Sequence, residues 1–129
     1  MVTPVFQITD YPQAIAFYVD WLGFHIDWEE RPASGGYYLQ ISCVNIVLHL
    51  TNYPNESSIG VRAMVQFTGL LSFQRLLLTK ESAFSAPQLQ KTTWNDKVMQ
   101  LELFDPVGNC LMLAEVCIRA ALPTYCYWR

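Results

Sequence analysis

Basic residues are scarce in this chain, and they form no stripe. Lys and Arg number 8 against 11 Asp and Glu, which gives a formal net charge of -3. Because phosphate binding needs a concentrated cationic surface, this composition disfavours nucleic acid as a partner. The small acidic surplus weakly favours cationic small molecules.

Long apolar runs and metal-like cysteine spacings are also absent. No apolar stretch approaches bilayer length, and the N-terminus MVTPVFQITD lacks the basic start and apolar run of a secretion signal. We therefore expect no membrane segment and a cytoplasmic protein. The cysteines form no CxxC pattern, and in a reducing compartment we expect them to be small apolar core residues: Cys43, Cys110, Cys117 and Cys126.

Apolar and aromatic side chains are abundant. They make up 52% and 14% of the 129 residues, which predicts a folded chain with one sizeable core. We expect a single domain over residues 1–129. It would hold one module at about 2–52, a second at about 61–116 and a tail at 117–129.

The first half predicts the order strand, helix, three strands. Residues 5–9 (VFQIT) suit a strand, and TDYPQAIAFYVDWLGF predicts a helix capped by Thr9 or Asp10 and ended by Gly23. The stretches FHIDWEER, YYLQIS and VNIVLHLT then alternate as strands do.

The second half repeats this order. VRAMVQFT predicts a strand, GLLSFQRLLLTKES a helix starting near Thr68 or Gly69, and KVMQLELF and CLMLAE two strands around the turn DPVGN. An irregular strand is expected within residues 84–93. The turn residues indicate a structural role for DPVGN, and the period of roughly sixty residues predicts two similar halves.

Side-chain alternation separates two faces in most of these strands. Ile46, Leu48 and Leu50 share an apolar face, whereas Val47 and His49 share a mixed one. The two predicted helices must pack on the apolar face of the sheet. The mixed face is therefore the predicted ligand-binding surface, a concave and partly desolvated pocket with a few polar groups. An ordinary solvated or dimer-covered face is the alternative. The other members expected on the mixed face are Thr3, Val5, Gln7, Tyr38, Gln40, Ser42, Asn45, Arg62, Met64, Gln66, Leu111, Leu113 and Glu115.

Two motifs in this order carry a family resemblance. AFYVDWLGF in the first helix and DPVGNCLMLAE at the close resemble the glyoxalase/bleomycin-resistance/extradiol-dioxygenase (vicinal oxygen chelate) superfamily, and most closely its bleomycin-resistance-like branch. The resemblance covers Pro4 to about Glu115. It implies an α+β fold of two βαβββ modules, with curved mixed sheets enclosing a cleft and helices on the convex side.

Metal-using members of that superfamily hold the ion with four strand residues, which correspond here to Thr3, His49, Arg62 and Glu115. Thr is a poor ligand and Arg has no lone pair to give. We therefore expect no metal and no other cofactor. A divalent metal held by other residues is the alternative.

The same positions are candidates for ligand contact. Glu115 would be the negative charge of the cleft, and Arg62 would replace a lost ligand and pair with Glu115, facing a ligand or merely neutralising it. For His49 we expect a hydrogen-bonded imidazole and no catalytic role.

Trp94 lies in the polar loop KTTWND. The resemblance implies that a Trp here stacks on flat, cationic ligands at the mouth of the cleft. Core packing is the alternative. The predicted ligand-binding set is completed by Tyr38 and Gln40.

We therefore predict a non-catalytic protein, similar to antibiotic-sequestering proteins, that holds an aromatic or cationic small molecule, for example a cationic antibiotic. A metal-dependent lyase or dioxygenase and a pure interaction module are the alternatives. The tail VCIRAALPTYCYWR is apolar and aromatic, so we expect it to pack on its own domain or on a second subunit. With the family's habit of dimerising, this predicts a homodimer.

Overall fold

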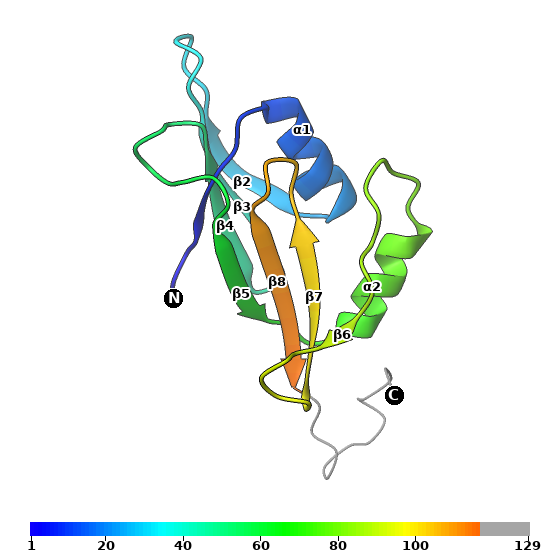
Figure 1. Ribbon diagram of the computed structural model, residues 1–129. Helices are drawn as coiled ribbons and strands as arrows, with labels where there is room; N and C mark the ends of the chain where they lie inside the picture. The colour runs from blue at the N-terminus through cyan, green and yellow to red at the C-terminus, as the bar shows by residue number, and fades with distance from the viewer. Residues whose placement is uncertain (117–129) are drawn as a thin grey trace. The chain divides into compact units, whose positions relative to one another are not determined.

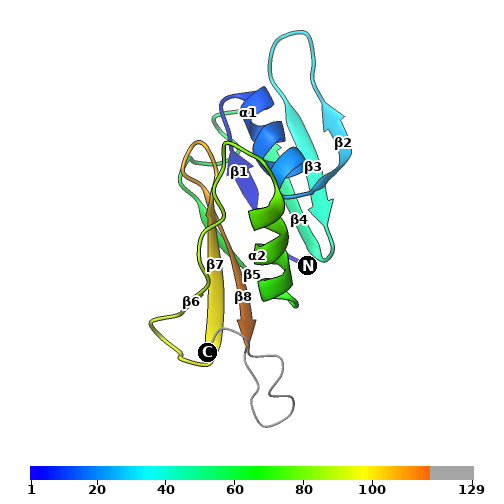
Figure 2. The same cartoon turned by 90° about the vertical axis from the view of Figure 1, so that its right-hand side faces the viewer.

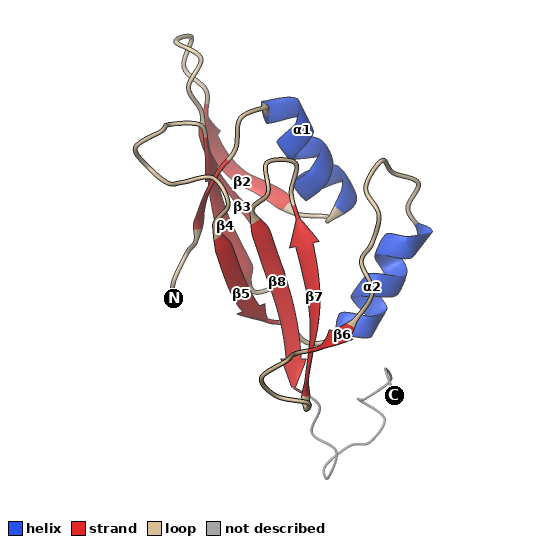
Figure 3. Cartoon of the chain, in the orientation of Figure 1, coloured by secondary structure: helices blue, strands red, loops and turns tan. Residues whose placement is uncertain are grey.

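The computed structural model describes residues 1–116, and it is an α+β fold with two four-stranded mixed sheets. The sheets are curved but not closed, as expected for two βαβββ modules. Their strand orders are β1-β4-β3-β2 and β5-β8-β7-β6 (Figures 1 and 3). The tail 117–129, with Cys117 and Cys126, lies outside the described residues. The elements are β1 (Val5–Gln7), α1 (Tyr11–Ile15), the π-helical segment η1 (Ala16–Trp21), β2 (His25–Glu30), β3 (Tyr38–Cys43), β4 (Ile46–Thr51), β5 (Arg62–Gln66), α2 (Leu70–Thr79), β6 (Gln90–Lys91), β7 (Val98–Phe104) and β8 (Cys110–Val116).

The described residues form two compact units. The first unit holds residues 1–63 and 104–110, and the second holds 64–103 and the described residues from 111 on. In residues 1–116, no helix is both long and apolar enough to cross a bilayer.

The helical segment of the first unit begins and ends as the sequence predicts. The Asp10 side chain accepts a hydrogen bond from the Gln13 amide, and Gly23 takes a positive φ of 87° just after the segment ends. Between these ends the apolar stripe of the segment is buried: Ala14, Phe17, Tyr18, Trp21 and Leu22.

The sheet of the first unit has the predicted alternation. β1 pairs with β4 in parallel, and β3 lies antiparallel between β4 and β2. Leu48 and Leu50 are fully buried while His49 between them is half-buried. Figures 1 and 2 show α1 alongside β2–β4, so one face of this sheet packs in the core and the other stays accessible.

The second unit pairs α2 with its own sheet, and Figures 1 and 2 show α2 alongside β7 and β8. The irregular strand expected before β7 is the two-residue β6, in which Gln90 pairs with Gln100 and Lys91 with Met99. β8 departs from the expected two-face split, since consecutive residues from Cys110 to Ala114 are all buried. A strand buried on both sides loses the alternation that distinguishes its faces in sequence.

The turn of the motif DPVGN is tied to the rest of the first unit through Asp105. One carboxylate oxygen of Asp105 accepts from the amides of Val107 and Asn109 at 3.0 and 2.8 Å. The other accepts from the Tyr18 hydroxyl at 2.7 Å in the core. Burial, followed by the negative charge of Asp105, raises the pKa of Tyr18 far above its ordinary value. The predicted structural role of the turn is confirmed, and it extends beyond local backbone bonds.

Candidate functional site

Three of the six predicted ligand-binding residues lie together on the accessible face of the first unit. Gln40 of β3 is directly opposite His49 of β4, and Trp28 of β2 is directly opposite Gln40. Tyr38 lies two residues before Gln40 on the same strand face. Cross-strand register therefore brings these four side chains into one cluster, called here the His49 cluster.

A chain of hydrogen bonds runs through this cluster. The Tyr38 hydroxyl lies 2.7 Å from His49 Nδ1, and His49 Nε2 lies 3.0 Å from Gln40 Oε1. The Gln40 amide nitrogen donates to an Asp27 carboxylate oxygen at 3.0 Å, and Ser42 Oγ donates to the other at 2.9 Å. The predicted hydrogen-bonded state of the His49 imidazole is thereby confirmed.

The pKa shifts along these hydrogen bonds favour a neutral His49 imidazole and an ionised Asp27 carboxylate, with Gln40 between them. Burial lowers the pKa of His49 below 6.5. The hydrogen bonds from Gln40, and then from Ser42, lower the pKa of Asp27. Above pH 6.5, therefore, His49 is neutral and Asp27 carries a negative charge.

The cluster also presents an aromatic surface. The rings of Trp28 and Tyr38 are parallel, with centroids 6.0 Å apart and an interplanar angle of 6°. The His49 ring meets Trp28 at 73° and Tyr38 at 79°. Because 44% of Trp28 is exposed, a large ring surface remains free for a planar ligand.

Asp27 belongs to this site although the sequence does not predict it, and it accepts from Gln40 and from Ser42, which was expected on the mixed face. Strict alternation puts Asp27 and Trp28 on opposite faces of β2. In the structure the β2–β3 register shifts between Ile26 and Trp28. Asp27 accepts a hydrogen bond from Gln40, and the Trp28 ring packs against His49. Such a bulge has no clear sequence signal here, since no glycine or proline lies within HIDWEE.

Glu115 bonds to the start of α2 in the second unit. Its two carboxylate oxygens accept from the Gly69 and Leu70 amides at 3.1 and 3.0 Å. These amides open α2, whose N-cap residue Gly69 has no side chain to satisfy them. The carboxylate therefore points toward α2, whereas alternation had placed it on the face away from the helices. The apolar strand β8 therefore ends on an acid that caps the start of α2.

Replacing Glu115 with alanine is expected to lower the free energy of unfolding by about 1–2 kcal/mol, because two helix-opening amides lose a charged acceptor. Glu115→Gln keeps one acceptor oxygen and should cost less. Urea unfolding measures both, with Glu81→Ala as the exposed control in the same unit. If Glu115→Ala matches that control, the capping role is wrong.

The remaining predicted residues lie elsewhere. Arg62 opens β5, and its guanidinium donates to Cys110 Sγ at 3.4 Å within the first unit. Thr3 precedes β1 by two residues. Trp94 lies in the loop before β7 in the second unit. The pairing of Arg62 with Glu115 and the ligand contact of Trp94 stay predictions.

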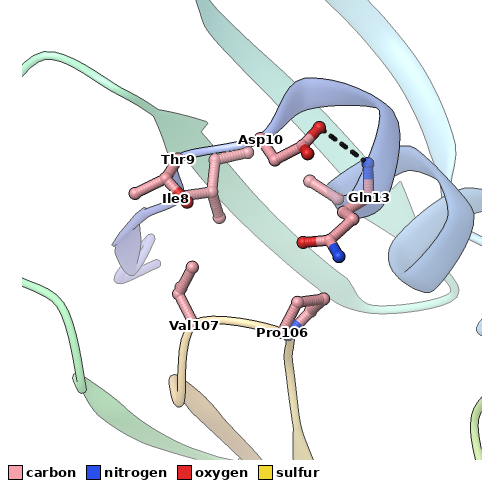
Figure 4. A pocket seen from close by; sticks show the side chains of 7 residues that line it. Ile8, Thr9, Asp10, Gln13, Pro106 and Val107 are labelled. Carbon is pink, nitrogen blue, oxygen red and sulfur yellow. Dashed lines mark hydrogen bonds between the residues drawn. The ribbon is translucent and has the colours of Figure 1, made fainter.

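Two hollows lie elsewhere in the first unit. A cavity of about 10 Å³ between the start of α1 and the DPVGN turn has room for roughly one water, and its Asp10 carboxylate already accepts from the Gln13 amide (Figure 4). A wider groove of about 390 Å³ lies at the loop between β2 and β3, beside Tyr11, Arg31 and Tyr37. The Arg31 guanidinium lies 3.9 Å above the Tyr11 ring and forms an ion pair with Glu29.

A family comparison accounts for this arrangement of two modules. The family described as "Glyoxalase superfamily protein" matches residues 1–118. The chain belongs to the glyoxalase superfamily. No curated protein matches it at a significant level.

Solved structures of proteins with 18–21% sequence identity share the fold. The bleomycin resistance determinant encoded on transposon Tn5 has a TM-score of 0.68 at 21% identity, covering 92% of this chain and 98% of its own. The bleomycin-binding protein from bleomycin-producing Streptomyces verticillus, complexed with copper(II)-bleomycin, has 0.65 at 20%, covering 87% and 92%. The antibiotic binding protein TnmS3 from Streptomyces sp. CB03234 has 0.63 at 18%, covering 88% and 93%.

The four positions at which the resemblance implies metal ligands do not fit a metal ion in this structure. Of these four positions, only His49 and Glu115 carry good metal-ligating groups, since Thr3 is a poor ligand and Arg62 has no lone pair to give. Both ring nitrogens of His49 and both carboxylate oxygens of Glu115 are already hydrogen-bonded. Within residues 1–116, no three His, Cys, Asp or Glu side chains are grouped so as to hold an ion.

Proposed function

We propose that this glyoxalase superfamily member binds a planar, cationic small molecule against the His49 cluster and sequesters it without converting it. The observation that carries the proposal is the parallel Trp28–Tyr38 pair with His49 at its edge, on an accessible sheet face. Aromatic faces attract flat rings and cations, with about 1 kcal/mol or more for each partly desolvated contact.

Negative charge beside the cluster supports a cationic ligand. The ionised Asp27 lies at one end of the hydrogen-bond chain. Burial raises the pKa of the Tyr38 hydroxyl, and the nearby charge of Glu56 raises it further. A positive ligand gains from both carboxylates.

The structural relatives support an antibiotic-like ligand. Several of them are bleomycin-binding or antibiotic binding proteins with the same fold. Isothermal titration calorimetry with bleomycin, and with small planar cations such as 4-aminoquinoline, tests the proposal directly. Saturable binding with no change in the recovered compound supports sequestration. A compound recovered in altered form, or stoichiometric metal in protein purified without chelator, supports the lyase or dioxygenase alternative.

Trp94 offers a second test of the ligand surface. Trp94 is 62% exposed, and the Thr92 hydroxyl holds its turn by accepting from the Asn95 amide and donating to the Asn95 carbonyl. Trp94→Ala is therefore expected to weaken ligand binding several-fold by loss of one stacking ring, while urea unfolding changes little. Unchanged affinity in the calorimeter removes Trp94 from the site.

A homodimer and a ligand contact by Arg62 complete the proposal. Sedimentation equilibrium of the full chain distinguishes a dimer from a monomer.

If Arg62 faces the ligand, its positive charge limits the affinity for cations, and Arg62→Gln tightens binding.

A further inference from the structure

We infer that the Tyr38 hydroxyl oxygen is the acceptor that selects ligands by an N–H donor, and that Asp27 fixes this role through Gln40 and His49. The inference rests on the proposed function and narrows the ligand class to planar cations that carry an N–H group. It depends on which group donates and which accepts in each hydrogen bond between Tyr38, His49, Gln40 and Asp27.

Asp27 determines which group donates in each of these hydrogen bonds. An ionised carboxylate only accepts hydrogen bonds, so the Gln40 group 3.0 Å from it is the NH₂. The Gln40 carbonyl oxygen therefore faces His49 and requires a proton on Nε2, 3.0 Å away. The opposite orientation would place the amide oxygen against the Asp27 carboxylate.

The protonation of His49 then determines that the Tyr38 hydroxyl is the donor in its hydrogen bond to His49. A neutral imidazole with its proton on Nε2 has only a lone pair on Nδ1. The Tyr38 hydroxyl must then donate its single proton to Nδ1, across 2.7 Å. In the part of the chain that the structure describes, the Tyr38 hydroxyl has no second hydrogen-bond partner, so its oxygen offers only lone pairs to a ligand.

The charge of Asp27 strengthens this acceptor. The donors of Tyr38, His49 and Gln40 all point toward the Asp27 carboxylate, and hydrogen bonds aligned in one direction polarise one another. The oxygen at the far end becomes richer in electron density. A ligand N–H beside a planar ring can reach this oxygen while the ring packs on the exposed part of Trp28. A carboxylate or phosphate ligand would meet lone pairs and like charge.

The histidine tautomer tests the direction without any ligand. The sequence has two histidines, and His25→Gln removes the other one. Long-range ¹H–¹⁵N correlation spectra of this variant therefore report His49 alone. We expect the Nε2–H form in this background. Asp27→Asn keeps an acceptor oxygen and should retain that form, whereas Asp27→Ala frees the Gln40 amide and should give a mixture of tautomers. A predominant Nδ1–H form above pH 7 would overturn the inference.

A matched pair of probes tests the selectivity in the full chain. Protonated 4-aminoquinoline has N–H donors, and N-methylquinolinium is a planar cation without one. We expect about tenfold tighter binding of the first, reduced to about twofold or less in Tyr38→Phe, because one charge-assisted hydrogen bond is lost.

The outcomes of this titration separate the two proposals. Equal binding of both probes by the unmodified chain would refute the selectivity and leave sequestration standing. If neither probe nor bleomycin binds, the proposed function fails, and the inference fails with it as a statement about ligands. Circular dichroism and thermal unfolding show whether Tyr38→Phe is folded, and the ring packing on Trp28 is preserved in that variant.

Discussion

Replacing Asn109 with alanine is expected to lower the free energy of unfolding by about 3 kcal/mol, since buried polar groups that lose their partners cost about 1–3 kcal/mol each and do not add fully. Asn109 is 0% exposed. Its Oδ1 accepts from the Gly60 and Val61 amides at 2.9 and 3.0 Å. Its Nδ2 donates to the Gln7 carbonyl at 2.7 Å and to an Asp105 oxygen at 2.9 Å. Alanine satisfies none of these groups.

Asn109→Asp separates hydrogen bonding from volume. The substitution keeps an acceptor for Gly60 and Val61 but sets a second carboxylate oxygen against Asp105 and the Gln7 carbonyl. We expect a large destabilisation near pH 7 that becomes smaller as the pH falls and the new carboxyl is protonated. Asn55→Ala is the exposed control. Urea unfolding of Asn109→Ala within about 0.5 kcal/mol of this control would contradict the role assigned to Asn109.

The fold could be predicted because most elements carry local signals. The Asp10 cap, the buried stripe of the first helix and Gly23 define that helix in sequence and in structure. The alternation through Leu48, His49 and Leu50 identifies the faces of the first sheet. β8 could not be divided in this way, because its side chains are buried on both sides from Cys110 to Ala114.

The site was only half predictable for a related reason. Alternation and register bring Tyr38, Gln40 and His49 together, and all of them stood in the predicted set. Asp27 depends on a bulge, which is a pairing irregularity that a single strand sequence does not reveal. The orientation of Glu115 depends on α2, a helix about 45 residues earlier in the chain. Long-range partners of this kind decide which of two faces a terminal strand residue takes.

The DPVGN turn shows a similar division between local and distant partners. Its dihedral preferences are local, and Gly108 takes the expected positive φ of 94°. The partners that make Asp105 and Asn109 important come from Tyr18 and Gln7, far away in sequence. Turn chemistry therefore predicts where the chain reverses, and only the packed structure shows how much stability depends on it.

Trp28→Ala is expected to weaken binding of protonated 4-aminoquinoline about tenfold or more, because the ligand loses the ring on which it packs. A partly desolvated ring contact with a cation contributes about 1–2 kcal/mol, and 1.4 kcal/mol corresponds to a factor of about ten in the dissociation constant. Trp28 is 44% exposed and also stacks on Tyr38, so the same change should lower the free energy of unfolding by only about 1 kcal/mol. Calorimetry and urea unfolding give the two numbers.

Two further variants determine what a loss of binding by Trp28→Ala means. Phe104→Ala truncates an aromatic side chain of the first unit that is 58% exposed and lies outside the His49 cluster, so its affinity should equal that of the unmodified chain. Trp28→Phe keeps a smaller ring and should recover part of the affinity. If Trp28→Ala binds as tightly as Phe104→Ala, the ligand does not pack on this face. A selective loss of binding by Trp28→Ala with retained stability therefore ties the ligand to the sheet face and not to the fold as a whole.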